Sequence, residues 1–450
     1  MNFIKLSRRA RGIKVAAVGL AAVSLTTAGI VSVGAASASA TAAPVTLRII
    51  NWVNPPANAV LTKINAEFHK KYPNITVQYQ TAAGSPVGAY GTLLQTAVDS
   101  NTADIVTMNF PIQPLPSNPT QANENNYQYW TTSGVFSSLT GQPWLKNLTS
   151  SALATETYNG NVYGVLSGEY QWVVFYNKAD FAKYHLSPPK TYAQFVTILK
   201  TLKKNKVTPI WLGLGGGAPG YAQEFLTEPL MQDLWAPHVA NGNLTAALDS
   251  NTVKWTSPYF LTAMSEEKTI AKYLEPNYTG EPWEGMPGAF ASNKAAMLLD
   301  GSWDLPSIQK ANPKIQVGSF PFPGSNVASQ NKPLVADDLT FAILKGSPNQ
   351  AAAEEWMSFF TSKSIYAQYV NATGISPSES GGTYSNFTSK ALGPIFGVGA
   401  NTAEIFPPLA ATNGFWDTDT NFPTLQLAIM DGSKTPAEVA ADYQADWPKS

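Results

Sequence analysis

VTLRII at residues 45–50, ITVQYQ at residues 75–80 and ADIVTM at residues 103–108 are the segments that decide the fold class. Each is rich in β-branched residues, which favour β-strands. Two groups of apolar residues at helical spacing separate these segments, namely Val60, Leu61, Ile64 and Phe68 and then Leu93, Leu94, Ala97 and Val98. The order strand, helix, strand, helix, strand predicts a parallel sheet with right-handed crossovers, and therefore an α/β protein.

The ends of these predicted strands indicate where a ligand would bind. In open parallel sheets, ligands lie beyond the carboxyl ends of the strands. We therefore expect the loops after Ile50 and Met108 to lie beside a ligand site. The candidate contacts in these loops are Asn51, Trp52, Asn54 and Asn109.

The first forty residues have the three parts of an export signal. Basic residues up to Lys14 precede an apolar stretch from about Val15 to Gly34, and Ala38-Ser39-Ala40 fits a signal-peptidase site. We expect cleavage near Ala40 and a secreted, periplasmic or cell-surface protein. An uncleaved membrane anchor is the alternative, because the apolar stretch approaches the ~20 residues that span a bilayer.

The composition of the mature chain excludes several functions. Cleavage removes five of the 29 Lys and Arg residues and no acidic residue, so 24 basic residues face 30 acidic ones. This balance argues against a nucleic-acid partner, which requires a basic surface. Without cysteine the chain has no disulfide, no thiol catalysis and no lipid anchor on a lipobox cysteine. The three histidines are far apart in the sequence, which argues against a histidine metal site, and we expect neither metal nor cofactor.

Aromatic and neutral polar residues are abundant instead. Aromatic residues make up 11% of the chain and charged residues only 13%. Flat apolar rings and neutral hydrogen-bonding groups match the C–H faces and hydroxyls of a sugar. The alternative is that these rings fill the core, as aromatic residues commonly do.

The rest of the chain carries further local signals. Residues 158–163, YNGNVY, predict a hairpin, and residues 171–176, QWVVFY, predict a strand. Capping boxes at Thr191–Gln194 and Thr435–Glu438 predict the starts of two helices. Further strands are expected at residues 208–214, 295–299, 315–320 and 339–344, and a helix at 351–360.

Several short motifs occur in a fixed order along most of the mature chain. They are FHKKYPNITV at 68–77, ADIV at 103–106, TYNGNVYGV at 157–165, FYNK at 175–178, PPKTYAQF at 188–195, DGSW at 300–303, PFPG at 321–324 and DGSKTPAE at 431–438. In this order the chain resembles the family 1 extracellular solute-binding proteins, of which maltose-binding protein is a familiar member.

The resemblance implies an α/β, two-lobed periplasmic-binding-protein-like fold with several hinge crossings and a ligand cleft between the lobes. Lobe 1 is then expected to comprise residues 44–167 and 335–372, and lobe 2 residues 168–334 and 373–450. It also implies a monomeric, non-catalytic protein that delivers a sugar to the permease of an ABC importer.

The resemblance also implies positions for ligand contacts. Trp303, with Asp304 beside it, and Trp416 stand where the family presents aromatic residues to the cleft. Two chain crossings supply the remaining candidates, which are Glu169, Tyr170, Gln171, Asp337 and Asp338. A packing or hinge role is the alternative for each of them.

Other chemistries remain open as alternatives. Glu281 and Glu284 could be the two carboxyl groups of a secreted glycoside hydrolase, although local spacing does not show that they flank a bond. Asp417–Asn421 copies the front half of a calcium loop but lacks its glycine and its closing glutamate. The same fold could also bind a polyamine, an anion or an amino acid, although these ligands need charged anchors.

Overall fold

A computed structural model describes residues 43–83, 88–108, 126–215, 222–379, 385–395, 401–402 and 422–447. The described part of the chain builds two main sheets, each with its own hydrophobic core. None of the described helices is long and apolar enough to cross a membrane. The predicted signal segment, Asn109, Trp416 and the calcium-like loop at 417–421 lie outside the described residues.

The first sheet has five strands and contains the predicted parallel unit. β1 pairs in parallel with β2 and with β3, as predicted, and β12 joins antiparallel to β3 and β6. The spatial order is β2 (Ile75–Ala82), β1 (Val45–Trp52), β3 (Ile105–Met108), β12 (Thr340–Ile343) and β6 (Gly164–Leu166).

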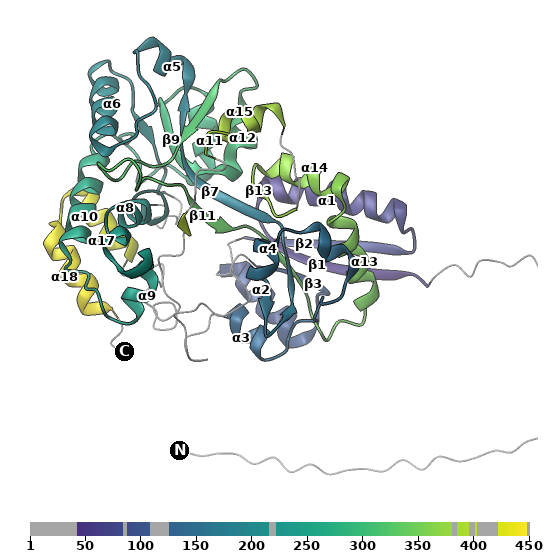
Figure 1. Cartoon of the computed structure of the whole chain (residues 1–450). Helices are drawn as coiled ribbons and strands as arrows, with labels where there is room; N and C mark the ends of the chain where they lie inside the picture. Colours follow the sequence, from purple (N-terminus) through teal and green to yellow (C-terminus); the bar gives the residue numbers. More distant parts are fainter. Residues whose placement is uncertain are drawn as a thin grey trace, which may run out of the picture. The chain divides into compact units, whose positions relative to one another are not determined.

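Helices close to this sheet bury its apolar residues. The core of the sheet includes Phe68 of α1 and Trp356 of α13, both fully buried, and α1 packs against β2, α13 and α14 (Figure 1). The helices of this part are α1 (Pro55–Lys71), α2 (Gly88–Ser100), α3 (Asn126–Thr132), α4 (Ser150–Thr155), α13 (Gln350–Phe360) and α14 (Lys363–Thr373).

The second sheet has seven strands and is organised around the long strand β7. β7 pairs antiparallel with β9, β10, β11 and β13. The strands are β14 (Asn401–Thr402), β11 (Leu334–Asp337), β7 (Gly168–Asn177), β9 (Met297–Gly301) and β8 (Ile210–Trp211) in spatial order, with β10 (Val317–Phe320) and β13 (Ser376–Pro377) beside β7.

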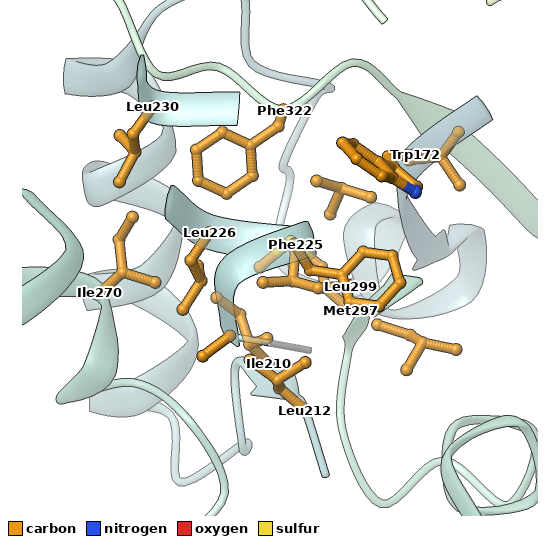
Figure 2. Packing of buried hydrophobic residues seen from close by; sticks show 14 of the residues in the cluster. Trp172, Ile210, Leu212, Phe225, Leu226, Leu230, Ile270, Met297, Leu299 and Phe322 are labelled. Carbon is orange, nitrogen blue, oxygen red and sulfur yellow. The ribbon is translucent and has the colours of Figure 1, made fainter. Parts of the chain in front are cut away.

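The core of this second sheet joins strand and helix residues from distant parts of the sequence. Figure 2 shows Trp172 of β7, Leu299 of β9 and Phe225, Leu226 and Leu230 as members of one cluster, and all five are buried. The helices here are α5 (Lys178–Lys183), α6 (Tyr192–Lys204), α8 (Glu228–Leu234), α9 (Leu244–Asp249), α10 (Pro258–Ala271), α11 (Met286–Ala291), α12 (Leu305–Ala311), α15 (Asn386–Leu392), α17 (Phe422–Asp431) and α18 (Pro436–Asp446).

The local turn signals had different outcomes. β4 (Thr157–Tyr158) and β5 (Asn161–Val162) form the predicted hairpin, and Asn159 and Gly160 both take positive φ in its turn. The capping box is confirmed at Thr435, whose hydroxyl and backbone N–H both bond Glu438. At Thr191 only one of the two capping-box bonds forms: the Gln194 N–H donates to the Thr191 hydroxyl. The second bond is absent, because the Gln194 side chain accepts from the Lys190 N–H instead of the Thr191 N–H.

The chain passes between the two sheets at two adjacent points, at Ser167 and Asp338, and again between α14 and β13. Ser167 lies between β6 and β7, and Asp338 lies between β11 and β12. The Asp338 N–H donates to the Gly168 carbonyl at 2.8 Å, and the Ser167 N–H donates to the Leu339 carbonyl at 2.7 Å. β11 still belongs to the second sheet, so the sheet changes at Asp338 rather than at the expected Val335. The predicted lobe boundaries themselves remain a proposal.

Candidate ligand-binding site

Four aromatic side chains gather at the start of β7, and we call them the aromatic group: Tyr170, Trp172, Phe225 and Trp303. The Tyr170 and Trp303 rings meet edge to face with centroids 4.7 Å apart. Phe225, from the π-helical turn η3 (Gln223–Thr227), lies 6.1 Å from Trp303 and 6.4 Å from Trp172. Tyr170 packs against the cores of both sheets, so the group stands where the two cores meet.

Trp303 owes its position to the residues before it. It lies in the short 3-10 turn η7 (Ser302–Asp304), which follows β9 directly. A Cβ on Gly301 would come within 2.0 Å of the indole, so the absent side chain of Gly301 leaves the space that the ring occupies. The Ser302 hydroxyl accepts from the Gln171 N–H at 3.2 Å and ties η7 to β7. Trp303 is half-buried, and part of the indole therefore faces solvent.

Asp304 is the last residue of the same turn and is buried. Burial raises its pKa to about 6, against the lowering effect of hydrogen bonds with Asp300, Ser307 and the Trp303 side chain. Ligand contact by Trp303 and by Asp304 stays a prediction.

Glu169, Gln171 and Asp337 lie on the opposite face of β7 from Tyr170, because successive side chains of a strand alternate in direction. Asp337 of β11 pairs with Glu169 in register. The Gln171 amide donates to the Ser376 hydroxyl at 2.6 Å, and Ser376 also pairs with Glu169. We predicted that Glu169, Gln171, Asp337 and Trp303 contact one ligand. In the structure the first three lie on one face of β7, whereas Trp303 packs against Tyr170 on the other face.

The carboxyl groups on this face are close together and poorly solvated. Burial, together with the charges of Glu169 and Asp338, raises the pKa of Asp337 to about 7. Burial also raises the pKa of Glu169. Asp338 is buried and accepts from the Ser167 hydroxyl at 2.9 Å and from Tyr369 at 3.2 Å. These bonds give Asp338 a structural role where the chain passes between the sheets.

The residues at the end of β1 form a separate group. Asn51 is completely buried, its Oδ1 accepts from Thr107 and Trp52, and its Nδ2 donates to Tyr79. Asn54 caps α1 by accepting from the Ala57 N–H. Trp52 is 9% exposed and packs edge to face on Tyr90. The structure thus gives Asn51 and Asn54 scaffold bonds and leaves only a small part of Trp52 exposed.

The sequence analysis missed Trp172 and Phe225. Trp172 could have been found, because it lies two residues after Tyr170 on the same strand and so shares its face. Phe225 carries no local signal, since its place depends on the π-helical turn. Among the described residues no cluster of three or more His, Asp or Glu side chains could hold a metal ion.

The carboxyl pair considered for hydrolysis comes from a segment that supplies none of the residues described above. Glu284 is exposed on the 3-10 turn η6 (Trp283–Gly285). Glu281 accepts a hydrogen bond from the Asn277 side chain at 3.3 Å.

Comparison with known proteins identifies the family. Residues 51–367 match the bacterial extracellular solute-binding proteins. The chain belongs to this family. The members that it resembles are binding proteins, and the family description places them outside the cell.

Two curated proteins illustrate the similarity. The multiple sugar-binding protein of Streptococcus mutans is 26% identical over 321 residues, 70% of this chain and 71% of that protein. The melibiose/raffinose/stachyose-binding protein MelE of Bacillus subtilis is 23% identical over 48% of this chain and 51% of its own.

Solved structures establish the two-lobed fold of this solute-binding protein. The solute-binding protein RafE in complex with raffinose superposes with a TM-score of 0.70, at 21% identity, over 89% of this chain and 98% of that chain. A chitin oligosaccharide binding protein also gives 0.70, at 20% identity, over 89% and 98%. At these identities the likeness shows the fold alone.

Proposed function

We propose that this protein is the secreted substrate-binding component of an ABC importer and that it binds a carbohydrate on the aromatic group. One observation carries the proposal: Trp303 is partly exposed, and it packs against Tyr170 and Phe225 in the space that the absent side chain of Gly301 leaves. An indole fixed in this way offers a flat apolar face whose orientation costs little to maintain on binding.

The chemistry of this surface suits a sugar. Stacking on a ring removes the C–H face of a pyranose from water and leaves its hydroxyls free to bond polar groups. The printed ligands of similar proteins, raffinose and stachyose among them, support a carbohydrate as well.

Membership of the family supports export and delivery to a permease. We propose that signal peptidase cleaves after Ala40, that the mature protein acts as a monomer without a lipid anchor, and that it hands its ligand to membrane permease subunits. We propose no hydrolysis of the ligand. Trp416, Asn109 and Trp52 remain proposed further contacts.

A thermal-shift screen of the mature protein tests the proposal. A ligand present at 100 times its Kd should stabilise the folded state by about 2.7 kcal/mol. We expect raffinose, stachyose or another neutral oligosaccharide to raise the Tm, and polyamines and amino acids to leave it unchanged. Trp303→Ala should abolish the shift, whereas Tyr259→Ala, which truncates a ring exposed on α10, should retain it.

Two results would contradict the proposal. Stabilisation by a polyamine or an amino acid, with none by any sugar, would refute the carbohydrate ligand. Release of reducing ends from a bound oligosaccharide, lost in Glu281→Gln or Glu284→Gln, would make the protein a hydrolase.

A further inference from the structure

Thr227 is the last residue of the π-helical turn η3, and its hydroxyl is the middle member of a buried hydrogen-bonded chain. The hydroxyl donates to Glu267 Oε2 of α10 at 2.7 Å, and it accepts from the side-chain amide of Gln426 on α17. All three residues are completely buried. α10 lies beside both α8 and α17 (Figure 1), and η3 packs against α10 and α17. One hydroxyl therefore joins η3 to two helices from distant parts of the sequence.

Other helical threonines of this protein use their hydroxyls differently. Those of Thr262 and Thr269 on α10, of Thr361 just after α13 and of Thr373 on α14 each donate to the carbonyl four residues earlier. Such local bonds are common for threonine in helices. The Thr227 hydroxyl donates to another helix instead. Its side chain therefore ties the turn to its neighbours rather than to the preceding residues.

The π-helical turn determines where Phe225 lies. A π-helical turn closes one residue later than an α-helical one, and such turns occur frequently at functional sites. If η3 became α-helical, the residues before it would rotate relative to α8 by about 100°, the angle of one residue in an α-helix. Phe225, in the middle of the turn, would then leave its place, where its ring centroid is 6.1 Å from that of Trp303 and 6.4 Å from that of Trp172.

We propose that Thr227 is a positioning residue for the aromatic group: Glu267 and Gln426 hold its hydroxyl, and this keeps η3 in the turn that sets Phe225 against Trp303. Without the hydroxyl, a buried carboxyl and a buried amide would lose their shared partner, which is costly, and η3 would shift against α10 and α17. The step to ligand affinity rests on the proposed function, because it requires Trp303 to touch the ligand. The positioning itself does not.

The first test needs no ligand. In ¹⁵N-tryptophan-labelled protein, the indole N–H signals of Trp303, Trp172 and Trp356 are each assigned by their loss in the Trp→Phe variant, among the signals of 12 tryptophans. Thr227→Val keeps the shape of the side chain and removes its hydroxyl. We expect the Trp303 and Trp172 signals to shift, because the Phe225 ring moves. The signal of Trp356, in the core of the first sheet, should stay in place.

Three further variants separate positioning from folding. Thr227→Ser retains the hydroxyl, so all three signals should keep their wild-type positions. Thr361→Val removes another completely buried hydroxyl, bonded within its own helix, and should leave the Trp303 and Trp172 signals unchanged. Gln426→Met removes the donor to Thr227 and should shift these two signals, so this variant decides if Thr227→Val does not fold. Unchanged signals in the variants that break the chain, or the same shifts in Thr361→Val, overturn the proposal.

The second test measures binding of the oligosaccharide that gives the largest thermal shift. Thr227→Val should weaken it about tenfold, or about 1.4 kcal/mol, and Thr227→Ser should bind as the wild type does. In the Phe225→Leu background Thr227→Val should change the affinity little, because the ring that it positions is gone. Equal losses in both backgrounds, or wild-type affinity in Thr227→Val, would contradict the coupling to the ligand. If no sugar binds the wild type, the proposed function fails, and the ligand-free signals still decide the positioning.

Discussion

Replacing Gly301 by alanine should displace the Trp303 indole without straining the backbone. Gly301 has φ −87° and ψ 157°, an extended conformation that alanine adopts freely. Its new Cβ would lie 2.0 Å from one indole carbon and 2.2 Å from two others. Carbon atoms pack at about 3.5–4.0 Å, so the ring must move by about 1.5 Å.

This displacement should be measurable in both stability and affinity. Overpacking of this kind costs about 1–3 kcal/mol in unfolding free energy. In Trp303→Ala the space is vacant, so the added methyl group should cost almost nothing there. Sugar binding should weaken by about 2 kcal/mol in Gly301→Ala, the range of an interface hot spot.

Urea unfolding and calorimetric titration of the single and double variants provide the assay. Gly285→Ala is a matched control, because its Cβ would meet nothing closer than 3.9 Å at φ −81°. Equal destabilisation by Gly301→Ala in both backgrounds, with unchanged binding, would refute the packing argument.

Three further predictions concern stability and processing. Asp104→Ala should cost about 3 kcal/mol in urea unfolding, because it leaves the Arg48 guanidinium, now 2.7 Å from that carboxylate, without its charge partner. Burial opposes ionisation of Asp104, but hydrogen bonds from Arg48 and Ser347 outweigh burial and lower the pKa of Asp104. The stability that Asp104 contributes should therefore be present above its pKa in the unfolded chain, and it should be lost as pH falls through its pKa in the folded protein. Burial raises the pKa of Glu267 to about 8. The stability that protonated Glu267 contributes should therefore be full below its pKa in the unfolded chain and be lost as pH rises through about 8. Glu267→Gln should flatten that alkaline limb of the unfolding profile, and an unchanged limb would contradict it. Intact-mass measurement of the exported protein should give an N-terminus at Thr41, and a retained signal segment would refute the cleavage prediction.

Local patterns predicted much of the fold. The β-branched runs and the helical spacing between them gave the parallel order of β1, β2 and β3. The strand expected at residues 208–214 is shorter, since β8 comprises only Ile210–Trp211. Beyond Trp211 the chain bonds a distant segment instead, with the Gly215 N–H donating to the Glu281 carbonyl at 2.8 Å. Such long-range pairing leaves no periodic signal in the sequence.

The candidate site was predicted less completely, for a geometric reason. Side-chain alternation along β7 separates Tyr170 from Glu169, and this could have been read from the sequence. The neighbours of Trp303 could not. Phe225 reaches the indole only through the π-helical turn.

Calorimetric titration of the mature protein with neutral oligosaccharides, in the wild type and in Trp303→Ala, tests the central claim most directly. We expect one sugar to bind with a stoichiometry of one and Trp303→Ala to weaken it about thirtyfold, or about 2 kcal/mol. Urea unfolding of the same variant should show a loss well below the 3–5 kcal/mol of a core tryptophan such as Trp356, which is fully buried. Equal affinity in both proteins, or saturation by no carbohydrate, would contradict the claim that a sugar stacks on the aromatic group.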